Sequence, residues 1–186
     1  MSTLKKLTHI SVDEYLDGEK AAEVRHEYSG GAVYAMAGAS VRHNLIAGTV
    51  AAALRAQVRG SEGYVFQSDM KVRIDDTFYY PDIVVTCGAI DLAAYYQASP
   101  VLIVEVLSES TEAKDRLEKR VAYQRLASVK EYALVAQDKL QIEVIRRVRD
   151  GWQIETYSHG DIVKFSSVGL EQPLESLYED VLRLLP

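Results

Sequence analysis

The sequence predicts a mixed α/β fold, in which helices pack on a β-sheet. Residues 101–107 form a continuous apolar run interrupted only by Glu105, which is typical of a central strand covered on both faces. Apolar residues between 45 and 58 recur at helical spacing, with Ser40 as the expected N-cap and Gly60 at the end. The 186 residues contain no repeat and no linker, so we expect one domain over residues 1–186.

The first half of the chain supplies strands on both sides of this long helix. Ser11 and Glu14 have the spacing of a capping box, which predicts a short helix. Two glycines separate residues 24–28 from residues 32–36 and predict a β-hairpin. Further elements follow the long helix. We expect strands at residues 64–67, 71–74 and 78–86, and a short helix at residues 89–97.

The second half continues the alternation of strands and helices. Residues 108–111 lead into an expected helix of about 12 residues that ends near Leu126, and an apolar strand follows at residues 131–136. The dipeptide Asp150-Gly151 is a strong hairpin signal between its flanking apolar segments. Those segments are residues 141–149 and 152–157. The tail, residues 174–185, has the pattern of a last amphipathic helix.

Composition limits the class of protein. An apolar fraction of 48% and a charged fraction of 26% are ordinary for a globular domain. No apolar stretch approaches the roughly 20 residues of a membrane span, no signal peptide is visible, and Cys87 is the sole cysteine. We therefore expect a cytoplasmic protein with no membrane contact. The net charge of −6 argues against simple electrostatic binding to nucleic acid without excluding it.

Basic residues are nevertheless unevenly placed along the chain. They gather in two clusters: Lys114, Arg116, Lys119, Arg120, Arg125 and Lys130, and then Arg146, Arg147 and Arg149. Such runs contact a polyanion in some proteins and are solvated surface in most.

Two acidic residues stand out because they lie on strands that should be buried. Asp82 follows Tyr80-Pro81 at the entry to an apolar strand, and Glu105 lies inside the run at residues 101–107. Burying a carboxylate is costly unless something pairs with it. Two such carboxylates suggest a shared hard cation, Mg²⁺ or Mn²⁺, with the main-chain carbonyl of Val106 as a third ligand. The sequence thus predicts a metal site at Asp82, Glu105 and Val106.

A lysine completes the candidate catalytic set. Asp115, Lys119 and Tyr123 are spaced at i, i+4 and i+8, so they should share one face of the predicted helix. On this interpretation Leu117, Val121 and Leu126 lie on or near the packing side. A bound divalent cation lowers the pKa of water and binds phosphate oxygens. Lys119 could orient that water or stabilise the developing charge.

The ordered combination resembles the PD-(D/E)xK nuclease superfamily and is most similar to the Uma-type family of bacterial restriction endonucleases. The motifs run from the hairpin to the strand after the last helix. They are Glu27 with Gly31, Met36 and Gly38; His43; Tyr80-Pro81-Asp82; Val104-Glu105-Val106-Leu107-Ser108; Asp115, Lys119 and Tyr123; and Glu131-Tyr132. Leu107 stands where the superfamily has its lysine, and Lys119 matches the place to which the Uma-type family has moved it.

The resemblance implies a restriction-endonuclease-like mixed β-sheet flanked by helices, with added β-hairpins. It also implies Mg²⁺- or Mn²⁺-dependent hydrolysis of nucleic acid, with DNA as the expected substrate and a homodimer as the expected assembly. Asp82, Glu105 and Lys119 would be catalytic.

Several supporting residues have two interpretations each. The resemblance makes Glu27 a further acid near the metal, but an edge-strand glutamate could equally face water. His43 could contact phosphate or transfer a proton, or could simply cap or pack the helix. Tyr123 is expected to pack and to support the site through its hydroxyl. Asp115 could cap a helix start, and Asp69 is expected in a loop.

The sequence is compatible with three functions. The first is a metal-dependent DNA endonuclease. The second is a catalytically inactive nuclease-fold domain that binds nucleic acid or protein. The third is a purely structural role, in which Glu105 and Lys119 form a buried ion pair without metal.

Overall fold

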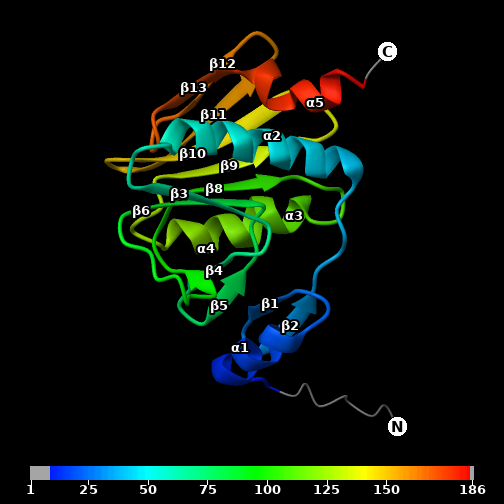
Figure 1. Cartoon of the computed structure of the whole chain (residues 1–186), viewed down its shortest axis with the longest axis vertical. Coiled ribbons are helices and arrows are strands. Elements are labelled where there is room, and N and C mark those ends of the chain that lie inside the picture. The colour runs from blue at the N-terminus through cyan, green and yellow to red at the C-terminus, as the bar shows by residue number, and fades with distance from the viewer. Residues whose placement is uncertain (1–8, 185–186) are drawn as a thin grey trace.

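A six-stranded mixed sheet forms the centre of the computed structural model, which describes residues 9–184 (Figure 1). Its strand order is β11-β10-β9-β8-β6-β3. The strands are β3 (Gly63–Gln67), β6 (Ile83–Cys87), β8 (Pro100–Val106), β9 (Glu131–Val135), β10 (Gln141–Val148) and β11 (Gly151–Ser158). Only β8 and β9 pair in parallel, and the other neighbours are antiparallel. The central strands β8 and β9 are buried along nearly their whole length, as the apolar run predicts.

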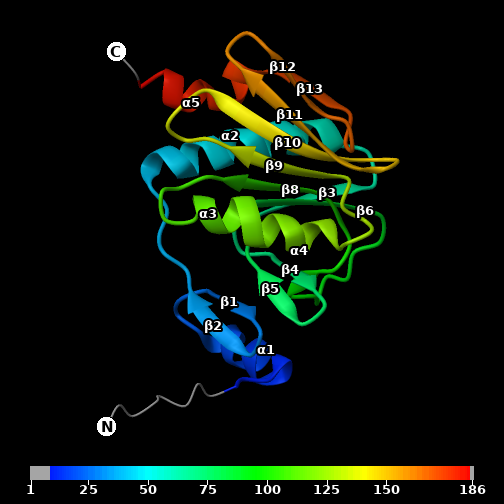
Figure 2. The same cartoon turned by 180° about the vertical axis from the view of Figure 1, so that it is seen from behind.

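Helices cover both faces of this sheet (Figures 1 and 2). Helix α2 (Val41–Val58) packs on one face, where it meets Leu102 and Val104 of β8. The opposite face carries a helix with three parts. These are α3 (Glu112–Lys114), the π-helical η1 (Asp115–Lys119) and α4 (Arg120–Gln124). Because strand side chains alternate between faces, Glu105 and Ile103 project toward this second helix.

The C-terminal elements extend the core on the α2 side. They are the hairpin β12 (Ile162–Phe165) and β13 (Leu170–Pro173), the 3₁₀ turn η2 (Leu174–Tyr178) and α5 (Glu179–Leu182). Phe165, Leu174 and Tyr178 join Ile46 of α2 in one buried cluster. Within the described residues, the predicted tail helix is thus a 3₁₀ turn followed by one short helix.

The N-terminal elements build a second sheet at the lower end of Figure 1, in the order β2-β1-β5-β4-β7. Its strands are β1 (His26–Ser29), β2 (Ala32–Ala35), β4 (Lys71–Ile74), β5 (Thr77–Tyr79) and β7 (Tyr96–Gln97). Helix α1 (Val12–Ala21) packs against this sheet. The predicted capping box of Ser11 and Glu14 is present. Tyr15, Tyr28 and Phe78 form the small core, with ring centroids 4.9 Å apart for the two tyrosines and 5.4 Å for Tyr15 and Phe78.

Two predicted elements are wrong. Residues 89–97 form turns that end in β7, because Asp91 accepts a hydrogen bond from the Ala93 N–H and the segment then pairs with β4. The predicted strand at residues 78–86 is divided at Tyr80-Pro81-Asp82, with β5 in the second sheet and β6 in the central one. This division places Asp82 at the junction of the two sheets.

The packing side predicted for the α3–η1–α4 helix is wrong for two of its three residues, whereas Leu126 packs against the core as predicted. Leu117 and Val121 are exposed, whereas the buried face carries Asp115, Lys119 and Tyr123. The reason is Glu105, which gives this face of the sheet a charged centre that the lysine must reach. Within residues 9–184, no helix is long and apolar enough to cross a membrane.

Candidate active site

Asp82 and Glu105 meet across the β6–β8 pair. Ile83 lies opposite Val104, so the next position of the antiparallel register brings Asp82 against Glu105. The Asp82 N–H lies 3.4 Å from Glu105 Oε2, and the Val106 N–H donates to Asp82 Oδ2 at 2.7 Å. The structure therefore brings all three residues of the predicted metal site together.

Lys119 lies among three carboxylates. Its Nζ is 3.0 Å from Glu105 Oε1, 3.0 Å from Glu27 Oε1 and 3.2 Å from Asp115 Oδ1, and the residue is 5% exposed. Burial opposes the charge of Lys119, but these carboxylates together raise its pKa well above the ordinary value. Lys119 is therefore a buried ammonium ion that holds the acidic cluster together.

Glu105 is the deepest of the acids. Its Oε1 also accepts a hydrogen bond from the Tyr123 hydroxyl at 3.3 Å. Burial raises the pKa of Glu105 well above the ordinary value, and the negative charges of Asp115 and Asp82 add to this effect although Lys119 opposes it. The neutral form of Glu105 is thus favoured unless further positive charge reaches the cluster.

Glu27 enters the site from the β1–β2 hairpin. Besides Lys119, it binds Lys114, whose Nζ lies 2.6 Å from Glu27 Oε2. Burial opposes its ionisation, but Lys119 and Lys114 lower the pKa of Glu27 below the ordinary value. The alternative in which this glutamate faces water is wrong, because Glu27 is buried.

His43 lies beside Asp82 in the first turn of α2. Ser40 caps the helix by accepting the His43 N–H at 3.1 Å, and this holds the imidazole Nε2 3.2 Å from Asp82 Oδ2. Burial favours the neutral ring, but Asp82 outweighs it and raises the pKa of His43. The Asp82 side chain is 21% exposed against 5% for Glu105, so solvent reaches the acids from the Asp82 side.

Asp115 and Asp69 differ sharply in their surroundings. Asp115 follows the first turn of its helix, which begins at Glu112 with Thr111 at the N-cap. Its side chain is buried against Lys119 instead of capping. Asp69 is an exposed loop residue that pairs with Arg25 at 3.3 Å, as expected for a loop.

The donor atoms of the site are mainly carboxylate oxygens, which hard divalent cations prefer. Within residues 9–184, no three His, Cys, Asp or Glu side chains are grouped as a ready metal cage. In the same described part, Asp115 Oδ1 is buried without a hydrogen bond, and its ion-pair contact is with the Lys119 ammonium at 3.2 Å. Two carboxylates and a main-chain carbonyl fit a hard cation that keeps several waters. The residues therefore suit Mg²⁺ or Mn²⁺, which keep bound waters, better than they suit a metal whose ligands are all side chains.

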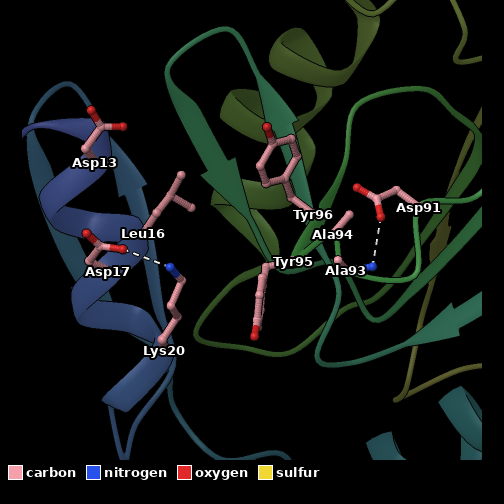
Figure 3. Close-up of a pocket in the computed structure, with 9 residues that line it drawn as sticks. All are labelled: Asp13, Leu16, Asp17, Lys20, Asp91, Ala93, Ala94, Tyr95 and Tyr96. Carbon is pink, nitrogen blue, oxygen red and sulfur yellow. Dashed lines mark hydrogen bonds and ion pairs between the residues drawn. The ribbon is translucent and has the colours of Figure 1, made fainter.

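In the part of the chain that the structure describes, one cleft adjoins the acidic cluster. This cleft of about 550 Å³ opens at the carboxyl ends of β8 and β9, where Leu107 and Ser108 directly follow Val106, and Arg42 precedes His43. A pocket of about 490 Å³ lies between α1 and residues 91–96, with Asp17 and Tyr95 on its opposite walls (Figure 3). The lining of neither includes the acidic cluster itself, but only the first is lined by residues directly next to Val106 and His43 in the sequence, so the first cleft is the better candidate for substrate.

Lys114 is the site residue that sequence reasoning missed. It appeared only as a member of a basic cluster, yet its ammonium binds Glu27 together with Lys119. The two lysines are five positions apart, which places them on different faces of an ideal α-helix. The π-helical η1 segment has more residues per turn and lies between them. No pattern in the sequence indicates that segment.

The fold is that of a nuclease-like protein of known structure. A crystal structure from Anabaena variabilis, described as "a putative nuclease belonging to DUF820", superposes with a TM-score of 0.76. The match covers 91% of this chain and 98% of that one, at 18% sequence identity. At this identity the likeness shows the fold alone, and it confirms the predicted mixed sheet flanked by helices.

Sequence comparison adds the family. The model of the Uma2 family, described as "Putative restriction endonuclease", matches residues 12–175. The chain therefore belongs to the Uma2 family, which confirms the resemblance found in the sequence. Two Synechocystis relatives are uncharacterized. Protein slr1290 is 34% identical over 173 residues (91% of both chains), and sll1609 is 30% identical over 155 residues (81% of this chain, 86% of the relative).

Proposed function

We propose that this protein is a metal-dependent endonuclease that hydrolyses phosphodiester bonds of DNA. The observation that carries the proposal is the cross-strand pair of Asp82 and Glu105 with the Lys119 ammonium 3.0 Å from Glu105. Membership of a family described as restriction endonucleases supports the same reaction class. Asp82, Glu105 and Lys119 are the proposed catalytic residues.

The division of work among these residues follows from their contacts. Asp82, Glu105 and the Val106 carbonyl would hold Mg²⁺ or Mn²⁺, which when bound supplies an acidified water and a counter-charge for the phosphate. Lys119 stabilises negative charge that develops beside Glu105, or orients the water. Because its ammonium is already held by Glu27 and Asp115, little reorganisation is needed when it acts.

Two further side chains position the acids. His43 Nε2 lies against Asp82 Oδ2, and the Tyr123 hydroxyl lies against Glu105 Oε1. Each contact restricts the rotamers of its carboxylate, which keeps the two acids facing each other. His43 also lies on the exposed side of the site, where it could contact a phosphate oxygen.

The whole chain contributes to this proposed site. Glu27 comes from the N-terminal hairpin, His43 from α2 and Lys119 from the helix on the opposite face, so we propose that residues 1–186 act as a single domain. We further propose a homodimer, since two-fold assembly is common and would present one site to each strand of a duplex. The proposed setting is DNA in the bacterial cytoplasm.

The direct test is replacement of Glu105 by alanine. We expect Glu105→Ala to lose cleavage of plasmid and oligonucleotide substrates in Mg²⁺ or Mn²⁺. Glu62→Ala, at an exposed glutamate, should cleave like the wild type. Cleavage by Glu105→Ala near the wild-type rate would disprove the proposal.

Thermal melting gives a second readout that does not depend on activity. A ligand that binds only the folded state raises the melting temperature by mass action. We expect Mg²⁺ or Mn²⁺ to raise it for the wild type and for Glu62→Ala, but not for Glu105→Ala. An equal rise in all three proteins would place the metal elsewhere.

One observation favours a second candidate function, binding without cleavage. Lys119 is engaged by three carboxylates and is almost fully buried, as a purely structural ion cluster would also require. A nuclease-fold domain of this kind would bind nucleic acid with an affinity that falls as salt rises. It would show no turnover in any metal.

A further inference from the structure

An exposed tyrosine borders the acidic cluster. In the β1–β2 hairpin, Tyr34 is the direct cross-strand partner of Glu27. Opposed residues of an antiparallel pair project to the same face. Glu27 turns its carboxylate toward Lys119, so Tyr34 lies on the face of the hairpin that is turned to the site. Tyr34 is nevertheless 51% exposed.

Lys114 connects this tyrosine to the catalytic cluster. Its ammonium lies 2.6 Å from Glu27 Oε2 and 5.2 Å from the centroid of the Tyr34 ring. The same ammonium lies 5.4 Å from the Tyr79 ring. The Lys114 side chain therefore lies between the Tyr34 ring and Glu27, the carboxylate that also binds Lys119.

The position of Tyr34 is unusual for a large apolar ring. Strand β2 is at the edge of its sheet, where proteins commonly place charged residues to discourage association. Met36 continues the same face, since its N–H donates to the Arg25 carbonyl one step further along the hairpin register. This edge thus places the Tyr34 ring, the Met36 thioether and the Lys114 ammonium beside the site proposed to cleave phosphodiester bonds.

We infer that Tyr34 and Lys114 form a stacking site for an unpaired nucleobase of the strand whose phosphate reaches Asp82 and Glu105. Aromatic rings and neighbouring cations are the usual means of holding single-stranded nucleic acid, because every base offers a π-face. The inference rests on the proposed function, since it takes the substrate to be nucleic acid. It adds that bases next to the cleaved bond are unpaired when bound.

The test is binding of three fluorescent probes, measured by anisotropy with Ca²⁺ in place of Mg²⁺. The probes are a single-stranded oligonucleotide, an abasic strand of the same length and a duplex. Tyr34→Ala should weaken binding of the base-containing single strand by about 5- to 150-fold and leave the abasic strand nearly unchanged. Tyr34→Phe, which keeps the ring, should bind like the wild type.

Tyr64 provides the matched control. It is 49% exposed and lies on β3, in the other sheet. Tyr64→Ala should therefore bind all three probes like the wild type, and the melting temperatures of all variants should agree because both tyrosines are exposed.

Each contrary result overturns a different part of the idea. Three results would disprove the stacking site. They are wild-type affinity in Tyr34→Ala, equal weakening of its binding to the abasic strand, and the same loss of affinity in Tyr34→Phe. If the wild type also cleaves DNA, the proposed nuclease function survives that failure. A wild type that neither binds nor cleaves any probe would overturn both proposals.

Discussion

Four acids share very little positive charge at the centre of this molecule. Glu27, Glu105 and Asp115 surround Lys119, and Asp82 lies against Glu105. Lys114 adds an ion pair to Glu27, and His43 contacts Asp82. A buried ion pair contributes little net stability, but removing one partner leaves buried charge without compensation. The lysine is therefore important for folding as well as for the proposed chemistry.

Replacing Lys119 tests this structural role. Lys119→Met keeps the length and apolar stem of the side chain, yet leaves Glu27, Glu105 and Asp115 without their common partner. We expect the free energy of unfolding to fall by about 3–5 kcal/mol at neutral pH, measured by urea denaturation. Lys130→Met, at an exposed lysine, is the control and should change it little. Equal denaturation midpoints for the two variants would contradict the importance of the cluster.

The N-terminal hairpin is the element on which the site depends most. It carries Glu27, and it is held to the rest of the protein by the aromatic core of Tyr15, Tyr28 and Phe78. A polar link adds to this attachment, since the Tyr80 hydroxyl donates to Glu19 Oε1 of α1 at 3.0 Å. This small core is separate from the two cores of the central sheet, so it can open locally.

Phe78→Ala should loosen this unit selectively. Loss of a fully buried phenylalanine destabilises by about 3–5 kcal/mol. We expect amide hydrogen exchange to accelerate most in residues 12–35, because that segment packs on the missing ring.

Phe165→Ala is the matched control, since Phe165 is equally buried but lies in the core next to α2. It should accelerate exchange in the central sheet. Uniform acceleration in Phe78→Ala would mean that the hairpin unfolds only with the whole protein.

At the scale of the whole molecule, a net charge of −6 must be reconciled with the proposed polyanionic substrate. The proposed cation would lower the local negative charge, and two basic residues lie nearby: Lys114 beside the hairpin and Arg42 in the adjoining cleft. Attraction is therefore expected only near the site, and the affinity for DNA should fall steeply with salt.

The proposed assembly is tested by sedimentation equilibrium. We expect a species of twice the 20.7 kDa chain mass, because a two-fold pair presents one site to each strand of a duplex. A monomer at micromolar concentration that still cuts both strands together would rule out the dimer.

The sequence by itself determined the features that depend on local pattern. The buried strand at residues 101–107, the hairpin at Asp150-Gly151 and the capped helix from Ser40 follow from periodicity and turn chemistry. Asp82 and Glu105 were recognisable as site residues because burying a carboxylate in an apolar strand is costly unless it serves a purpose. Their meeting required only that two strands be neighbours.

Only the tertiary structure decided how the cluster is completed. Lys114 and Glu27 are 87 positions apart, and their contact depends on the hairpin packing against a π-helical turn that no local pattern indicates. The same applies to the division at Tyr80-Pro81-Asp82, the pairing of His43 with Asp82 and the exposed face of Tyr34. These features arise from contacts between distant elements, where compensation of buried charge outweighs local propensity.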